Sequence, residues 1–325
     1  MAIITATDLT KNYITYKRGD SLRETVASVF RREKVVVEAV KGVSFSVDRG
    51  EIVGLLGKNG AGKSTTLKML TGILLPTKGE VDVLGFSPFR QRSKYVSRIG
   101  GVFGQKSQLV WDIPPLDSFR MNKAIYGVPD GVYNGQLELM AGILNAGEII
   151  KRPTRSLSLG ERMKCEFIMA MLHKPEVVFL DEPTIGLDIL AKEAIRLFIL
   201  DMNRKGVTFI LTTHDIQDVE RLAGRVIIIN SGEKVFEDTQ EALKRRLGER
   251  KSVDVVFKTP VEGIALDGVT VLSRKNPMEA AISVDCSVTP MNRFIAYMSE
   301  LGEIADISIR GPGMEEIIKS IYAGG

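Results

Sequence analysis

The segment GKNGAGKS, residues 57–64, constrains the fold of this chain more than any other stretch of its sequence. A short apolar run, EIVGLLG, precedes it, and in the following KSTTLKMLTGIL the residues Leu67, Leu70 and Ile73 recur at helical spacing. A strand, a glycine-rich turn and a helix in this order let backbone N–H groups converge on an anion at the helix N-terminus. The sequence therefore predicts an α/β fold with a phosphate site.

The spacing of this segment fits G-x-x-x-x-G-K-[ST], a pattern that cradles nucleotide phosphates. Lys63 adds a positive charge for the β and γ phosphates, and the hydroxyl of Ser64 reaches Mg²⁺. The predicted binding residues are Gly57, Lys58, Asn59, Gly60, Ala61, Gly62, Lys63, Ser64 and Thr65. A chance glycine-rich turn is the alternative, and the strand and helix that flank the segment argue against it.

A second apolar strand, in VVFLDEP, ends in two carboxylates, Asp181 and Glu182. Ligands of α/β sheets lie at this edge, so we predict that Asp181 holds Mg²⁺ through water and that Glu182 is the general base for the attacking water. His214 ends the strand VTFILTTH and is predicted to contact the γ phosphate at the same edge. Gln105, in GVFGQKSQL, carries an amide for Mg²⁺ or the attacking water, whereas His173 is assigned a structural role.

The first predicted domain spans residues 1–245 and has an α/β core, because buried strands alternate with helices along it. One of its apolar segments is RVIIINSGEKVFE, at 225–237. A helical insert is expected at about 105–165, with amphipathic helices at 116–127 and 135–150.

The second predicted domain spans residues 250–325 and is a small α+β unit. The charged segment 240–252 marks the boundary, with a helix that ends at Gly248. Four strand-like runs follow, interrupted by the helical MNRFIAYMSELG and closed by the helical MEEIIKSIY at 314–322.

The segment Lys17–Lys34, KRGDSLRETVASVFRREK, allows two interpretations. Its basic residues, with Leu22, Val26 and Val29 roughly on one helical face, are compatible with an amphipathic helix at a membrane surface. A solvated insertion between two strands is the favoured interpretation.

Composition narrows the function classes. A formal net charge of +4 over 325 residues is small, so nucleic acid is not expected as a partner. Cys165 and Cys286 lie far apart without metal-ligand spacing, which indicates a reducing compartment. The N-terminus lacks a signal-peptide pattern, and no apolar run approaches the roughly 20 residues that span a bilayer. We therefore expect any membrane work to require another chain.

Five motifs in order, GKNGAGKST, Gln105, LSLGE, VVFLDEPTIGLD and LTTHD, resemble those of the nucleotide-binding subunits of ATP-binding cassette (ABC) transporters. The resemblance covers roughly residues 3–240 and implies a P-loop NTPase core of the ABC ATPase type. The long segment before EAVKGVSF, the WDIPPLDSFR stretch and the C-terminal ending look most like subunits of bacterial and archaeal multidrug or natural-product exporters.

This resemblance implies that two such domains sandwich two ATP molecules. Ser158 and Gly160 would touch the γ phosphate across the interface, and Asp188 would link the two sites. Gln105 would report the nucleotide state to a membrane permease docked on the helical insert. Tyr13 is the candidate for stacking on adenine, since the usual aromatic position reads EKVVVE here, and Tyr16 comes next.

The resemblance also implies an activity, partners and a location. The chain would hydrolyse ATP to power an exporter through an integral membrane permease subunit, together with a second nucleotide-binding subunit in a homodimer. It would be cytoplasmic and peripheral on the inner face of the cell membrane. The C-terminal domain is expected to support dimer contacts or regulation.

Two other function classes are compatible with a phosphate-binding loop. A soluble ABC ATPase that remodels nucleic acid or ribosomes is disfavoured, because the sequence has no long heptad coiled coil, second cassette or strongly basic block. A nucleotide-gated scaffold that hydrolyses poorly is disfavoured by Glu182 and His214.

The string LSLGE departs from the Leu-Ser-Gly-Gly-Gln that the family usually carries, and by itself it fits a helix cap. Ser158 and Glu161 have the spacing of a capping box, worth on the order of 1 kcal/mol. Because the capped helix also points its N–H groups at an anion, the two interpretations are compatible. Leu159 stands where a glycine is usual, so the close approach to a nucleotide is the feature most affected.

Overall fold

The computed structural model describes residues 1–16, 34–104, 106–245 and 250–311. It divides into two compact units, Met1–Glu237 and a second that begins at Asp238, and each is described on its own. Residues 17–33 of the predicted amphipathic segment, Gln105, Gly248 and the predicted helix at 314–322 lie outside the described residues. No helix in the described ranges has both the length and the apolar character needed to cross a membrane.

A six-stranded sheet lies at the centre of the first unit, in the order β5-β6-β7-β3-β8-β9. Its strands are β3 (Ile52–Leu56), β5 (Ile99–Phe103), β6 (Val177–Asp181), β7 (Thr208–Thr213), β8 (Arg225–Asn230) and β9 (Glu233–Thr239). The first five of these in spatial order pair in parallel. β3 and β7 are buried along their whole length, as expected for parallel strands covered on both faces. The predicted α/β core is confirmed.

The segment 225–237 is two strands rather than the single apolar segment that the sequence suggested. Ser231 and Gly232 have φ values of +50° and +89°, which suit a two-residue turn between neighbouring strands. The chain reverses there and forms the β8–β9 edge of the sheet.

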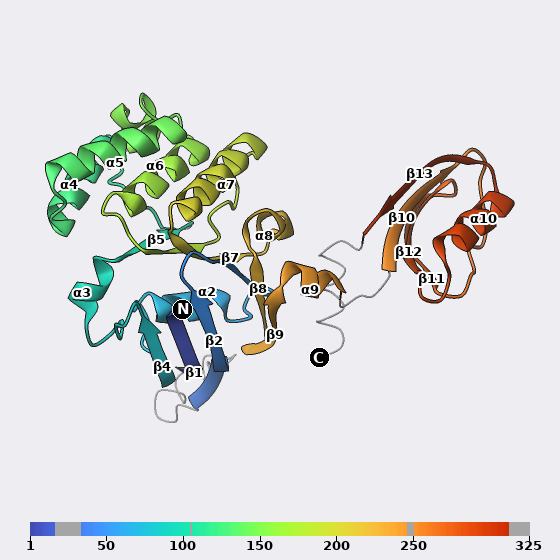
Figure 1. Ribbon diagram of the computed structural model, residues 1–325, viewed down its shortest axis with the longest axis horizontal. Coiled ribbons are helices and arrows are strands. Elements are labelled where there is room, and N and C mark those ends of the chain that lie inside the picture. Colours follow the sequence, from blue (N-terminus) through green and yellow to red (C-terminus); the bar gives the residue numbers. More distant parts are fainter. Residues whose placement is uncertain (17–33, 105, 246–249, 312–325) are drawn as a thin grey trace, which may run out of the picture. The chain divides into compact units, whose positions relative to one another are not determined.

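A second sheet, antiparallel and three-stranded, was not predicted. It contains β1 (Ala2–Tyr16), β2 (Lys34–Asp48) and β4 (Lys78–Val83) in the order β2-β1-β4. Helix α2 (Lys63–Leu70) lies between the two sheets, where its Leu67 and Leu70 are fully buried in a core that both sheets share (Figure 1). The helix that follows the phosphate loop is therefore held from both sides.

Helices gather on the other side of the parallel sheet, where α4, α5, α6 and α7 lie together (Figure 1). The helices of this unit are α3 (Arg92–Val96), α4 (Pro115–Tyr126), α5 (Asp130–Ile143), α6 (Leu159–Met171), α7 (Ile189–Arg204) and α8 (Ile216–Leu222), with 3-10 turns at Ile149–Lys151 and Thr154–Ser156. The helix expected at 135–150 was placed wrongly. It starts after Pro129 and ends at Ile143, because Asn145 takes a φ of +48° that a helix does not allow.

The second unit has its own sheet and its own core, which confirms the predicted α+β fold. Its sheet has the order β11-β12-β10-β13, with strands β10 (Arg250–Phe257), β11 (Val269–Asn276), β12 (Glu279–Asp285) and β13 (Ile304–Arg310), all antiparallel. Helix α10 (Met291–Leu301) covers one face through Phe294 and Met298, both fully buried. A short helix, α9 (Gln240–Arg245), precedes β10.

Candidate functional site

Three neighbouring strands bring the predicted site residues to one edge of the parallel sheet. β3 pairs with β7, so that Leu56 lies opposite Thr213, and β6 pairs with β7, so that Asp181 lies opposite Thr212. The phosphate loop, Glu182 and His214 each follow the carboxyl end of one of these strands. This is the edge at which parallel α/β sheets bind ligands.

The phosphate loop closes tightly before α2. Gly62 caps the helix with a φ of +108°, and a Cβ at this position would lie 2.5 Å from the carbonyl oxygen of Ala39. Only glycine satisfies both conditions. The first turn of α2 contains no acidic residue, so its N–H groups and the positive end of the helix dipole face an anion without competition.

Lys63 reaches back over the loop. Its Nζ donates hydrogen bonds to the carbonyl oxygens of Gly57, at 2.7 Å, and of Lys58, at 3.3 Å. Burial lowers the pKa of Lys63, while the carboxylates of Glu182 and Asp181 act in the opposite direction. The ammonium group is thereby held in place before any phosphate arrives.

Asp181 is surrounded by hydroxyl groups. Its Oδ1 accepts hydrogen bonds from Ser64 Oγ at 2.8 Å and from Thr212 Oγ1 at 2.5 Å. An all-oxygen set with one carboxylate fits Mg²⁺, which prefers few carboxylate ligands and keeps much of its water. The motifs do not point to Thr212, but its place at the end of a buried strand beside β6 is a signal that could have identified it.

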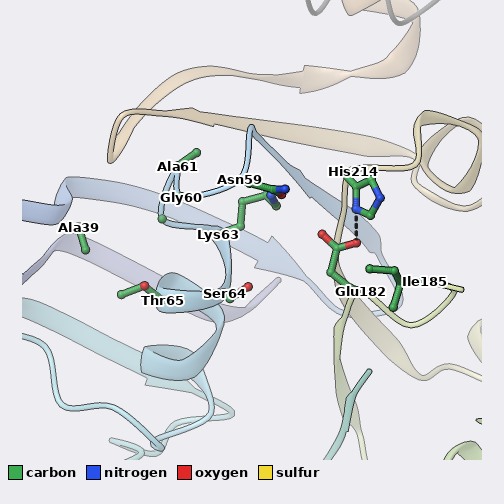
Figure 2. Close-up of a pocket in the computed structure, with 11 residues that line it drawn as sticks. Ala39, Asn59, Gly60, Ala61, Lys63, Ser64, Thr65, Glu182, Ile185 and His214 are labelled. Atoms are coloured by element: carbon green, nitrogen blue, oxygen red, sulfur yellow. Dashed lines mark hydrogen bonds and ion pairs between the residues drawn. The ribbon is translucent and has the colours of Figure 1, made fainter. Parts of the chain in front are cut away.

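Glu182 and His214 form a pair across the loop ends (Figure 2). The Nδ1 atom of His214 lies 2.7 Å from Oε2 of Glu182, and the two side chains are 53% and 18% exposed. Glu182 has a φ of +53°, rare for a non-glycine residue, and its N–H donates to the carbonyl oxygen of Thr212 at 3.0 Å. The carboxylate faces the phosphate loop with one oxygen already engaged.

The pocket enclosed by these groups has a volume of about 310 Å³. It is lined by Ala39, Asn59, Gly60, Ala61, Gly62, Lys63, Ser64, Thr65, Glu182, Ile185 and His214 (Figure 2). Asp181 lines an adjoining pocket together with Ser64. Tyr13 is not part of this lining: it is 39% exposed on β1, opposite Val37 of β2.

The LSLGE string forms the start of α6, and none of its residues lines this pocket. Glu161 N–H donates to Ser158 Oγ at 3.2 Å, and Ser158 N–H donates to Glu161 Oε2 at 2.8 Å, so the predicted capping box is present. The Ser158 N–H and the nearby Arg152 lower the pKa of Glu161. Gln105, the remaining predicted site residue, lies outside the described residues.

The start of α6 packs on the start of α7 in the same chain. A Cβ at Gly160 would lie 2.8 Å from Cβ of Ala191, and a Cβ at Gly186 would lie 3.1 Å from Leu159 Cδ2. Asp188 caps α7, with its Oδ1 accepting from Ala191 N–H at 2.8 Å. The LSLGE string therefore packs against Gly186 and Ala191, the residues around Asp188, an arrangement that sequence spacing did not reveal.

Comparison with known proteins identifies the family. Residues 40–185 match the ABC transporter family. The ABC transporter ATP-binding protein NatA of Bacillus subtilis is 33% identical over 214 residues, which cover 66% of this chain and 87% of that protein. A fluoroquinolones export ATP-binding protein of Mycobacterium tuberculosis is 34% identical over 222 residues, covering 68% of this chain and 72% of that protein.

Solved structures agree on the fold. A dimeric ATP-binding cassette in a post-hydrolysis state, bound to ADP and Pi, matches with a TM-score of 0.59 and 23% identity, covering 73% of this chain and 98% of that chain. The chain therefore belongs to the ABC transporter family, as an ATP-binding protein that hydrolyses ATP.

Proposed function

We propose that this chain is the ATP-hydrolysing subunit of an exporter and works through a separate membrane permease. The observation that carries the proposal is the pocket in which the phosphate loop faces the Glu182–His214 pair. Export is supported by the relative from Mycobacterium tuberculosis, whose name assigns it to the export of fluoroquinolones.

In this proposal the residues of the pocket divide the chemistry among them. Lys63 and the N–H groups at the start of α2 bind the β and γ phosphates. The bond between His214 and Glu182 Oε2 orients the carboxylate, so that Oε1 accepts the proton of the attacking water. Bound Mg²⁺ supplies positive charge to the phosphate oxygens, and Ser64 and Asp181, with Gln105, are the residues that would hold it.

A second copy of the chain completes each site in this proposal. Among the described residues, the N–H groups of Leu159 and Gly160 make no hydrogen bond, because the capping box engages only Ser158 and Glu161. Such a helix N-terminus suits the γ phosphate of a nucleotide held by the partner. The contact of Gly160 with Ala191 next to Asp188 offers a route between the two sites.

Adenine stacking is assigned to Tyr13. The register of β1 and β2 places Tyr13 opposite Val37, two residues before Ala39 of the pocket lining. An exposed aromatic ring at this distance along the strand offers a flat apolar surface for a base.

Co-purification from native membranes tests the proposal. The tagged chain should bring down a polytopic membrane protein, and a Lys63→Ala variant should retain it, because the permease docks away from the nucleotide. Recovery of nucleic acid or ribosomes in place of a membrane protein would instead favour the soluble remodelling ATPase.

A further inference from the structure

Asp218 is a fully buried carboxylate that neither the motifs nor the chemistry above account for. It lies on α8 and is 0% exposed. A buried carboxylate carries a large desolvation cost unless it is paired and hydrogen-bonded. Its position four residues before the buried Leu222 shows that it lies on the apolar face of the helix.

Its two oxygens have separate partners. Oδ1 accepts from Nε of Arg196, at 2.7 Å, and Arg196 is itself only 6% exposed on α7. Oδ2 accepts from the hydroxyl of Thr184 and, at 3.4 Å, from the hydroxyl of Thr213. The arginine offsets the charge of Asp218, so Oδ2 is left to bind hydroxyl groups.

The two threonines belong to the two loops that carry the Glu182–His214 pair. Thr184 comes two residues after Glu182, and Thr213 comes directly before His214. The Thr213 hydroxyl also accepts from the N–H of Asp215, at 2.9 Å, so His214 is bracketed by residues that are hydrogen-bonded to each other. One carboxylate oxygen therefore joins the two loops beneath the site.

Glu182 needs such support because its backbone is strained. A non-glycine residue with φ near +53° persists only when its surroundings over-determine the conformation. On its N-terminal side, the bond from Glu182 N–H to Thr212 provides that support. On its C-terminal side, Thr184 is 2% exposed and anchored to Asp218.

We propose that Asp218 is a positioning residue, which keeps Glu182 and His214 in hydrogen-bonding register by tying Thr184 and Thr213 to one oxygen atom. This inference rests on the catalytic roles proposed for Glu182 and His214. Asp218 acts through the two loops and does not itself touch the nucleotide.

Thr184→Val tests the inference most cleanly, because it removes one hydroxyl while keeping the side-chain shape and the Arg196–Asp218 ion pair. We expect kcat for ATP hydrolysis to fall about tenfold or more, since small misplacements of catalytic groups are costly. The Kd for MgATP should stay within about twofold, and Thr184→Ser, which restores the hydroxyl, should recover kcat. Each rate is divided by the amount of nucleotide bound per chain, so that only folded protein is counted.

A double variant separates positioning from general loosening. Combined with His214→Ala, Thr184→Val should cost little further kcat, because the pair that it positions is already lost. The matched control is Thr289→Val in the second unit, which removes a buried hydroxyl that donates to the backbone carbonyl oxygen of Asp267 and should leave kcat unchanged.

The outcomes are distinct. The positioning role would be overturned if Thr184→Val kept the wild-type kcat. It would also be overturned if Thr184→Val lowered kcat by the same factor in the His214→Ala variant as in the wild-type chain. Wild-type turnover in His214→Ala and in Glu182→Gln would instead overturn the proposed catalytic pair on which the inference rests.

Discussion

At the scale of single residues, Lys63 illustrates how the site is prepared before a nucleotide binds. Its ammonium group is buried, which lowers its pKa, and two backbone carbonyls hold it over the loop. The side-chain conformational entropy of this lysine is therefore lost when the chain folds, and not when ATP binds. The bound phosphate then gains a preorganised charge.

We predict that Lys63→Ala weakens ATP binding by about 10- to 100-fold, the range expected for losing a hydrogen bond from a charged group. Titration with a fluorescent ATP analogue measures the Kd. Lys205→Ala is the control, because Lys205 is exposed at the end of α7 and, among the described residues, forms an ion pair with Asp201 alone. An unchanged Kd in Lys63→Ala would contradict the role of this residue.

Glu161 links the capping box to pH. Its folded pKa is lowered, so the stability contributed by the charged form is fully present above the ordinary value near 4.5 and is lost as pH falls through the folded value. Glu161→Ala should therefore lower the melting temperature at pH 7 by about 2–4 °C, as expected for a cap worth about 1 kcal/mol. Melting curves between pH 7 and 3 should show this gap closing on the acid side. A gap that stays the same size as the pH falls below 4.5 would show that capping by the charged form is not its source.

At the scale of elements, the contact between α6 and α7 depends on Gly160. A methyl group there would lie 2.8 Å from Cβ of Ala191, closer than side chains pack. The N-terminal ends of α6 and α7 can therefore pack this closely only if position 160 or position 191 is glycine.

Gly160→Ala should lower the melting temperature, by overpacking of about 1–3 kcal/mol, and Gly160→Ala combined with Ala191→Gly should restore much of it. Thermal unfolding monitored by circular dichroism compares the single and double variants. Ala191→Gly alone gives the loss of stability that this second substitution causes in the wild-type chain. If it lowers the melting temperature of Gly160→Ala by the same amount, the contact between the two positions does not determine how the helices pack.

In the first unit, the sequence predicted the apolar strands that precede motifs but did not predict the antiparallel sheet. β3, β6 and β7 were recognised because they are short, apolar and followed by chemistry-bearing residues. Strands were expected on both sides of residues 17–34, but their pairing into an antiparallel sheet was not predicted, because bulges in the β1–β2 pairing break the two-residue alternation that identifies a strand. Asp218 was missed because its partners come from distant loops and a helix, and spacing along the chain carries no trace of them.

At the scale of the whole molecule, the two units have separate hydrophobic cores, so a substitution in one core should lower the stability of that unit alone. Phe294 is fully buried in the second unit, and its loss leaves a cavity worth about 3–5 kcal/mol.

We predict that Phe294→Ala lowers one calorimetric transition and leaves the Kd for ATP unchanged, since the nucleotide pocket lies in the first unit. The neighbouring Ile295→Ala, at a side chain that is 37% exposed, is the matched control and should change the transition little. A loss of ATP affinity in Phe294→Ala would show that the two units are energetically coupled.

The central claim is that Glu182 is the general base of a site completed by a second copy of the chain. Glu182→Gln, assayed for ATP hydrolysis and for mass in solution with ATP and Mg²⁺, tests it most directly. We predict that the variant binds ATP, loses at least about 100-fold in turnover, as expected for removal of a general base, and accumulates as a dimer. Turnover at the wild-type rate would contradict the catalytic assignment, and a monomer that holds ATP would contradict the shared site.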